Sequence, residues 1–546
     1  MPLKPKQAWF LAFTAVFAVL AGFVFWGTWS TDVAPVMPDC PVSYPSNWFY
    51  SWFRGWMASG KFVPGDLKWF LGTPYFWQEL QYVLALYCAG LGMAYFLRGH
   101  GLSRLASYGA GLLLAFCGYW MTLFSAGHLG WFQWMTYGVF AFGLVDRALE
   151  KGKARHWLLL GATLAWGSFY QPDLWLLFTV FTAAYFAFRW ISVRTLPWKG
   201  MLMALAAFVV IGLPSFRSAI VNDLAGRDQQ IAEGQTLGRQ AQATAADAAA
   251  EREKRWVFVT NWSLPPAETV EFFRAGVNGD TSCLLTQALG HGWVRPYTGA
   301  LGRPLGAPQG NYRQHSLYVG DACLLALLAV LLCLAGFIGF ERFGGAGRFL
   351  ASRQPLPRAA RPVIVFFLVS AVLFWLLSLG RYCEPVYRVV FSLPMGDYLR
   401  APVKWHHLTE FCLVVLAGFG LEALWRISTR TWWRGAIALM VFCCAVDLAK
   451  VDRRYCAPQP VDYQLQLADA RQVSVPQTRQ YLEQQGIRVL GSANGVAVIG
   501  RHVAPEKMKD PLPPFGLQTL LGILSALASI GILGYSVGSV SRRMKA

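Results

Sequence analysis

The segment AWFLAFTAVFAVLAGFVFWGT, residues 8–28, holds 21 consecutive positions without a charged side chain. A helix of about 20 apolar residues is long enough to cross the hydrocarbon core of a membrane. Lys4 and Lys6 precede the segment, which is too long for a signal peptide and lacks a small-residue cleavage site. We therefore predict a retained transmembrane helix here, and the same pattern recurs along the chain.

The composition of the whole chain agrees with a membrane protein. Of its 546 residues, 55% are hydrophobic, 15% are aromatic and only 14% are charged, which excludes an ordinary soluble enzyme. The formal net charge of +19 comes from basic residues that recur in short runs between apolar segments. Such spacing reflects membrane topology, so we expect membrane lipids as partners and no nucleic acid.

We predict an all-α polytopic membrane protein with about twelve transmembrane helices. The expected spans are residues 8–28, 76–97, 105–124, 131–146, 157–170, 172–189, 200–214, 320–340, 362–380, 406–425, 435–450 and 513–537. The spans that begin near residues 131, 157, 172 and 200 are short. They tilt, extend into flanking residues or partly re-enter the membrane.

Basic residues mark alternate connections between these spans, and this decides the orientation. The marked connections contain Lys4 and Lys6; Arg98 and Arg104; Arg147, Lys151, Lys153 and Arg155; Arg189, Arg194 and Lys199; five arginines between 342 and 361; Arg426, Arg430 and Arg434; and Arg542, Arg543 and Lys545. The opposite short turns, at 125–130 and 171–173, contain no Lys or Arg. The positive-inside rule therefore places both termini in the cytoplasm.

Most of the residues outside the membrane then fall on the extracytoplasmic side. Residues 227–256, rich in Ala, Gln, Glu and Arg, favour a solvated helix. Residues 488–503 predict two short strands joined near Asn494-Gly495. We expect a transmembrane domain over residues 1–450 with outer loops 29–75, 215–319 and 381–405, a small outer α+β segment over 451–512, and a final helix with a basic tail over 513–546.

Four cysteines fall outside the expected spans, where disulfides are permitted. They are Cys40, Cys283, Cys383 and Cys456, which allow three pairings that the sequence does not distinguish. The sequence contains no CxxC or HExxH motif and no His/Cys cluster that would indicate a zinc site.

Five stretches carry a resemblance to a known family. They are GDLKWFLGTP at 65–74, LRGHGLSRLASYGAGLLLAFCGYWMTLFSAGHLGW at 97–131, NWSLPPAETVEFFRAGVNG at 261–279, YVG at 318–320 and SLPMGDYLRAPVKWHHLTEFCLVVLAGFGLEAL at 392–424. In this order and spacing they resemble the YfhO-type bacterial membrane proteins, which belong with the GT-C group of integral membrane glycosyltransferases. The resemblance extends from about residue 8 to about residue 425.

The resemblance implies a GT-C-like fold in the bacterial inner membrane, with an acidic residue on the first outer loop. It also implies a lipid-linked sugar donor, a polyprenyl-phosphate sugar. The sugar is transferred to an extracytoplasmic acceptor, usually with inversion at the anomeric carbon. Asp32 matches the acidic residue. The chain lacks a contiguous DxD or DE pair, because Asp32 and Asp39 are seven positions apart. Dependence on a divalent metal, Mg or Mn, therefore stays open.

Asp32 is our candidate general base, with Asp39 or Asp66 as a helper. The acceptor hydroxyl must lose its proton as it attacks, and a carboxylate within hydrogen-bond reach can take it. The alternative is that these are ordinary solvated loop acids. Two neighbouring features favour a site at the membrane surface. Prolines stiffen the loop, and a tryptophan-rich amphipathic stretch follows at residues 46–62.

The leaving polyprenyl phosphate needs cations, and the stretch DYLRAPVKWHH, residues 397–407, offers them. We expect Arg400, Lys404 and His406 to contact the phosphate, with Arg217 and Arg381 as weaker candidates at other outer span ends. The alternative for each cation is that it snorkels and anchors a helix end.

Three further positions are candidates at the same side. His128, in a short outer turn, is either a structural hydrogen-bonding group or an acid–base helper or metal ligand. Asp173 is either a helix N-cap or an inward-facing substrate-binding acid. Glu268, with Glu271, is expected to begin a short interfacial helix, and contact with donor or acceptor is the alternative.

Two other functions fit the same composition. A transporter or flippase of lipid-linked saccharides requires a polar path through the membrane centre, whereas a non-catalytic scaffold requires no site at all. The charged residues gather at the ends of the expected spans, which favours the enzyme.

Overall fold

The computed structural model describes fourteen stretches of the chain in detail. They are residues 5–25, 33–35, 74–118, 129–169, 172–193, 197–218, 245–278, 317–337, 360–393, 401–453, 458–460, 463–493, 496–502 and 516–545, together with the single residues 356, 396 and 399. All structural statements below concern these residues.

Each of the twelve expected spans contains a helix. These helices are α1 (Pro5–Val24), α3 (Pro74–Gly99), α4 (Arg104–Ala115), α6 (Leu129–Lys151), α7 (Ala154–Gly167), α8 (Pro172–Val193), α9 (Trp198–Ser218), α13 (Asp321–Phe337), α15 (Arg361–Ser378), α17 (His406–Ile427), α18 (Thr431–Arg453) and α21 (Leu517–Lys545). Among the described residues, seven helices are long and apolar enough to cross a membrane: α1, α3, α8, α9, α15, α17 and α21. The expectation of a helical membrane protein is met, and the count of twelve crossings stays a prediction.

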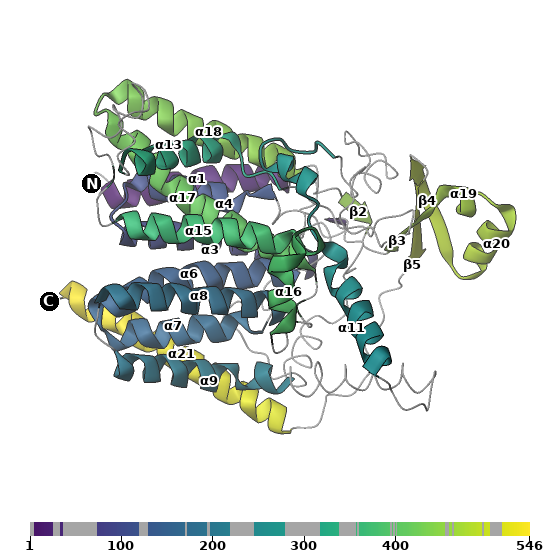
Figure 1. Cartoon of the computed structure of the whole chain (residues 1–546), viewed down its shortest axis with the longest axis horizontal. Coiled ribbons are helices and arrows are strands. Elements are labelled where there is room, and N and C mark those ends of the chain that lie inside the picture. The colour runs from purple at the N-terminus through teal and green to yellow at the C-terminus, as the bar shows by residue number, and fades with distance from the viewer. Residues whose placement is uncertain are drawn as a thin grey trace.

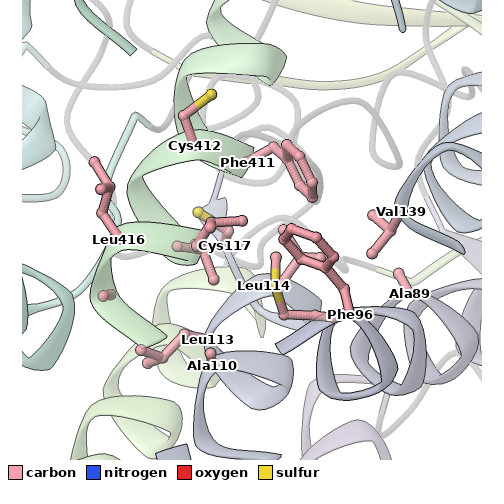
Figure 2. Packing of buried hydrophobic residues seen from close by; sticks show 14 of the residues in the cluster. Ala89, Phe96, Ala110, Leu113, Leu114, Cys117, Val139, Phe411, Cys412 and Leu416 are labelled. Carbon is pink, nitrogen blue, oxygen red and sulfur yellow. The ribbon is translucent and has the colours of Figure 1, made fainter. Parts of the chain in front are cut away.

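Helix α17 lies at the centre of the bundle, between α13, α15 and α4. Most of its side chains are buried. Figure 2 shows Phe411 of α17 and Phe96 of α3 pointing toward one another, with Val139 of α6 beside them. Aromatic rings continue this core, since Phe411 lies 4.9 Å from Phe142 between ring centroids. The sequence allows such packing because apolar residues occupy almost every position between the ends of α17.

The bundle has two different ends (Figure 1). Helix α1 begins and α21 ends at one of them, which we call the terminal end. The opposite end, which we call the distal end, carries α11 (Ala245–Val259), α16 (Glu384–Ser392) and the β-strands. Arg252, Glu253 and Lys254 in the middle of α11 are exposed, as expected for a solvated helix, whereas Trp256 near its end is buried against Phe391 of α16.

Two small antiparallel sheets lie beyond the distal end (Figure 1). Strand β1 (Val33–Pro35) pairs with β2 (Pro458–Pro460). Strands β3 (Tyr463–Asp469), β5 (Val496–His502) and β4 (Ile487–Ala493) form a three-stranded sheet with β5 in the middle. Two helices, α19 (Ala470–Val473) and α20 (Pro476–Gln484), connect β3 to β4. The two strands expected around Asn494-Gly495 are confirmed as β4 and β5.

Candidate functional site

Four short 3₁₀ helices close the described part of the distal end. They are η3 (Thr260–Trp262), η4 (Pro266–Phe272), η7 (Gly380–Cys383) and η9 (Pro402–Trp405). Proline starts two of them, because its fixed φ suits the first helical position and its missing N–H costs nothing there. One small apolar core joins all four, built from Trp262, Leu264, Phe272, Leu317, Leu379, Ala401 and Val403.

Backbone and side-chain hydrogen bonds fix these helices to one another. The Leu264 N–H donates to the Ser378 carbonyl at 2.9 Å, and the Ala401 N–H donates to the Val259 carbonyl at 3.0 Å. Arg381 binds η3 twice: its backbone N–H donates to Ser263 Oγ at 2.9 Å, and its Nε donates to the Thr260 carbonyl at 3.1 Å. Arg381, a candidate for substrate binding, therefore has a structural contact in addition to any role in binding.

The backbone around Ala401 is strained. Ala401 has φ of 67°, the positive value that L-residues with a Cβ rarely adopt, and it is the one such non-glycine residue among those described. Gly380 has φ of 49°, and a Cβ there would overlap both Ser263 Oγ and Pro402. Strain of this kind costs about 1–3 kcal/mol and gathers at functional sites. It positions the stretch that begins α17.

Several ionisable side chains are buried at the start of α17 and just before it. Lys404 is 7% exposed, and His406, His407 and Glu410 are fully buried. His406 Nε2 lies 3.3 Å from Glu410 Oε1, one helical turn further along. A histidine paired with a carboxylate can hold or pass a proton. Lys404 and His406 lie just before and at the start of this helix, and both are more buried than surface anchors would be; their position on the outer side of the membrane stays a prediction.

Helix η4 brings two acids to the same region. Glu268 is 3% exposed and Glu271 is fully buried, and Glu271 Oε1 accepts a hydrogen bond from the Asn278 N–H at 2.7 Å. The last residue of η4, Phe272, packs against the His406 ring with centroids 4.7 Å apart. The predicted short helix with two early acids is confirmed, as a 3₁₀ helix, and it contacts the start of α17.

Tyr387 of α16 makes a hydrogen bond to the segment that precedes η9. Its hydroxyl donates to the Leu399 carbonyl at 2.9 Å, just before Arg400. Burial raises the pKa of Tyr387 well above its usual value, so the hydroxyl stays protonated and remains a donor.

Sequence reasoning missed two buried carboxyl groups at the distal end. Glu410 was not selected because it follows two histidines in an otherwise apolar helix, and Asp452 because it ends a span followed by Arg453. Asp452 is fully buried, and neither of its carboxyl oxygens makes a hydrogen bond with a described residue. An acid inside the first or last two turns of an apolar helix is the signal that could have identified each.

Several predicted site residues lie outside the described residues. These are Asp32, Asp39, Asp66, His128 and Arg400. Asp173 is the second residue of α8, and its side chain also lies outside the described set. Val33, the residue after Asp32, pairs with Pro460 in the small β1–β2 sheet. The expected convergence of Asp32 with the cations therefore stays a prediction.

Arg217 is separate from the other predicted cations. It lies near the end of α9, where its Nη1 donates to Gln518 Oε1 of α21 at 2.9 Å. Helices α9 and α21 run along the edge of the bundle, away from α17 (Figure 1). The structure does not bring Arg217 together with Lys404.

Metal ligands and disulfides stay open. No group of three or more His, Cys, Asp or Glu side chains in the described part of the chain could hold a metal ion. Of the four outer cysteines, Cys383 in η7 is a half-buried free thiol, and the other three lie outside the described residues.

Comparison of the chain with protein-family models, with curated proteins and with solved structures finds no match. The resemblance to YfhO-type proteins therefore stays a prediction.

Proposed function

We propose that this chain is a GT-C-type membrane glycosyltransferase that moves a sugar from a polyprenyl-phosphate donor to an extracytoplasmic acceptor. The observation that carries the proposal is the buried group at the distal end, where Lys404, His406, Glu410 and Glu268 lie on elements that contact one another. Buried ionisable groups at the end of a membrane bundle cost free energy and indicate function.

The proposed topology supplies the right surroundings for this chemistry. We infer about twelve crossings of the bacterial inner membrane with both termini in the cytoplasm. The common position of the start of α1 and the end of α21 supports an even number of crossings (Figure 1). The distal end would then face the extracytoplasmic side, where the lipid carrier presents its sugar.

The reaction assigns each group a role. The acceptor oxygen forms a bond to the anomeric carbon while the bond from that carbon to the phosphate oxygen breaks, and Asp32 takes the acceptor proton. Arg400 and Lys404 hold the phosphate as its negative charge develops. The His406–Glu410 pair lies at the start of α17, which directly follows η9 with Lys404, and it would hold the lysine and the phosphate in position.

The distribution of charge favours an enzyme over a transporter. Within the twelve helices named above, every Asp, Glu, Lys and Arg lies within seven residues, about two turns, of a helix end. A transporter needs ionisable groups along a path through the bilayer centre. The apolar middle of α17, from Phe411 to Leu421, gives no such path.

The test is sugar transfer in membranes that contain the full chain. Membranes carrying the parent chain, Asp32→Asn or Asp321→Asn are given a panel of tritiated polyprenyl-phosphate hexoses, and release of the free lipid phosphate is followed. Asp321 is a matched control because it is an exposed carboxylate at the start of α13 and has no role in the proposed reaction.

We expect Asp32→Asn to lower the rate by at least about 100-fold, the contribution of one general base, with unchanged amounts of protein in the membrane. Asp321→Asn should keep the parental rate. Full transfer by Asp32→Asn refutes the catalytic assignment. Absence of transfer by the parent from every donor supports a scaffold or transporter instead.

A further inference from the structure

Two cavities adjoin one another at the terminal end of the bundle. The first has a volume of about 300 Å³ and is lined by Trp9, Arg98, Ser103, Arg104, Leu105 and Trp425. The second, about 130 Å³, is an apolar groove between α1, α4 and α18. Trp9 and Leu105 line both, so the polar cavity continues directly into the apolar groove.

The first cavity has an excess of positive charge. Arg104 is half-buried and makes no hydrogen bond or ion pair with the described residues. Arg98 donates one hydrogen bond to the Leu102 carbonyl and lines the same cavity. Arg434 adds a third cation beside the cavity, because its guanidinium lies 4.8 Å from the centre of the Trp425 ring.

The backbone at the start of α4 also favours binding of a negatively charged group. Ser103 caps α4, its Oγ accepting the Ala106 N–H at 3.3 Å, and the first N–H groups of any helix lack partners within the helix. One acid lies nearby, since Glu422 Oε2 accepts the Ser103 N–H at 2.6 Å. Arg426 pairs with Glu422 at 2.5 Å and offsets its charge, so Arg98 and Arg104 keep the cavity positive.

The groove has the opposite character. Its walls are side chains of α1, α4 and α18, among them Phe13, Leu112, Val441 and Phe442, and it is almost wholly apolar. Ala12 is exposed on the side of α1 that lines the groove. The tryptophans Trp9 and Trp425 lie at its polar mouth, as tryptophans do at the depth of lipid head groups.

We propose that an anionic phospholipid occupies this pair of cavities, with its head-group phosphate at Arg104 and Arg98 and one acyl chain in the groove between α1 and α18. The charge of the cavity matches a phosphate, and the groove that continues from it matches an acyl chain. Basic pockets between transmembrane helices bind anionic head groups in this way. A free phosphate would satisfy the arginines but would leave the groove without a role.

The experiment measures lipid binding to the full chain in detergent by native mass spectrometry. The probes are phosphatidylglycerol, phosphatidylcholine with the same acyl chains, and glycerol 3-phosphate as the free anion. Four variants are compared with the parent: Arg104→Gln and Arg104→Lys at the head-group cavity, Ala12→Trp in the groove, and Arg430→Gln as the control. Arg430 is exposed at the same end and outside both cavities.

We expect the parent to retain phosphatidylglycerol in preference to phosphatidylcholine. Arg104→Gln should weaken phosphatidylglycerol binding roughly fivefold, the effect of one cation near a lipid head group, whereas Arg104→Lys and Arg430→Gln should retain it. Ala12→Trp should weaken phosphatidylglycerol binding and leave binding of glycerol 3-phosphate unchanged.

Three results overturn the proposal. Equal binding of the two phospholipids shows that charge plays no part. Equal weakening by Arg104→Gln and Arg430→Gln shows diffuse attraction instead of a site. Displacement of phosphatidylglycerol by glycerol 3-phosphate, with Ala12→Trp behaving as the parent, shows a free-phosphate site.

Discussion

Ala401 and Gly380 show how single residues set the geometry of the distal end. Both have positive φ, and Pro402, the neighbour of Ala401, is one of the groups that a Cβ on Gly380 would overlap. The chain therefore keeps a strained alanine next to a glycine that no other residue can replace without moving η3 or η9. The strain lies directly before Lys404 and the His406–Glu410 pair, so it fixes where that group begins.

At this scale we predict that Gly380→Ala destabilises the protein more than Gly101→Ala. Both glycines have positive φ, 49° and 77°, but a Cβ on Gly101 meets no atom within 4 Å. Gly101→Ala should cost about 1–2 kcal/mol from backbone conformation alone. Gly380→Ala should cost about 1–3 kcal/mol more, from overpacking against Ser263 and Pro402. Thermal unfolding of the two variants in detergent measures the difference, and equal melting temperatures contradict it.

Residue identity predicted part of the site and missed part of it. Lys404 and His406 were identifiable because cations and histidines at the outer end of a span are unusual. Glu410 and Asp452 were not selected, because their importance comes from burial, which depends on how α17 and α18 face their neighbours. A sequence shows how far an acid lies from a helix end but does not show what packs over it.

At the scale of elements, apolar runs predicted all twelve helices but not their ends. Helices α6, α8 and α9 extend beyond the expected spans into flanking residues, one of the three alternatives for these short segments. At the terminal end the helices extend through Lys, Arg and Glu residues, because these residues have high helix propensity and their long side chains can reach the membrane interface. The short helix η4 was predicted, but η3, η7 and η9 were not, because such short turns depend on tertiary contacts for their conformation.

Close contact between α13 and α17 depends on a glycine, and we predict that Gly420→Val separates these helices. A Cβ on Gly420 would overlap the Ala326 carbonyl, whereas a Cβ on Gly435 of α18 meets no atom within 4 Å. Gly420→Val should therefore lower stability by about 1–3 kcal/mol, and Gly435→Val should change it by well under half of that. A thiol-reactive fluorescent dye measures unfolding directly, because Cys323 and Cys412 are buried on these two helices. Equal unfolding temperatures for the two variants contradict the close approach.

At the scale of the whole molecule, the two ends of the bundle carry different chemistry. The distal end buries acids, histidines and a lysine beneath short 3₁₀ helices. The terminal end gathers arginines around an open cavity that continues into an apolar groove. Charge pattern alone predicted this division, because basic residues mark alternate connections.

The most direct test of this account is photo-crosslinking of the full chain in membranes with a polyprenyl phosphate that carries a diazirine near its phosphate. Mass spectrometry then identifies the labelled peptides. We predict that label concentrates on residues 381–410 and 261–278 at the distal end, and that an unlabelled polyprenyl-phosphate sugar competes for it. Label that concentrates at the start of α4 and along α1, or that spreads evenly over the helices without competition, contradicts a donor site at the distal end.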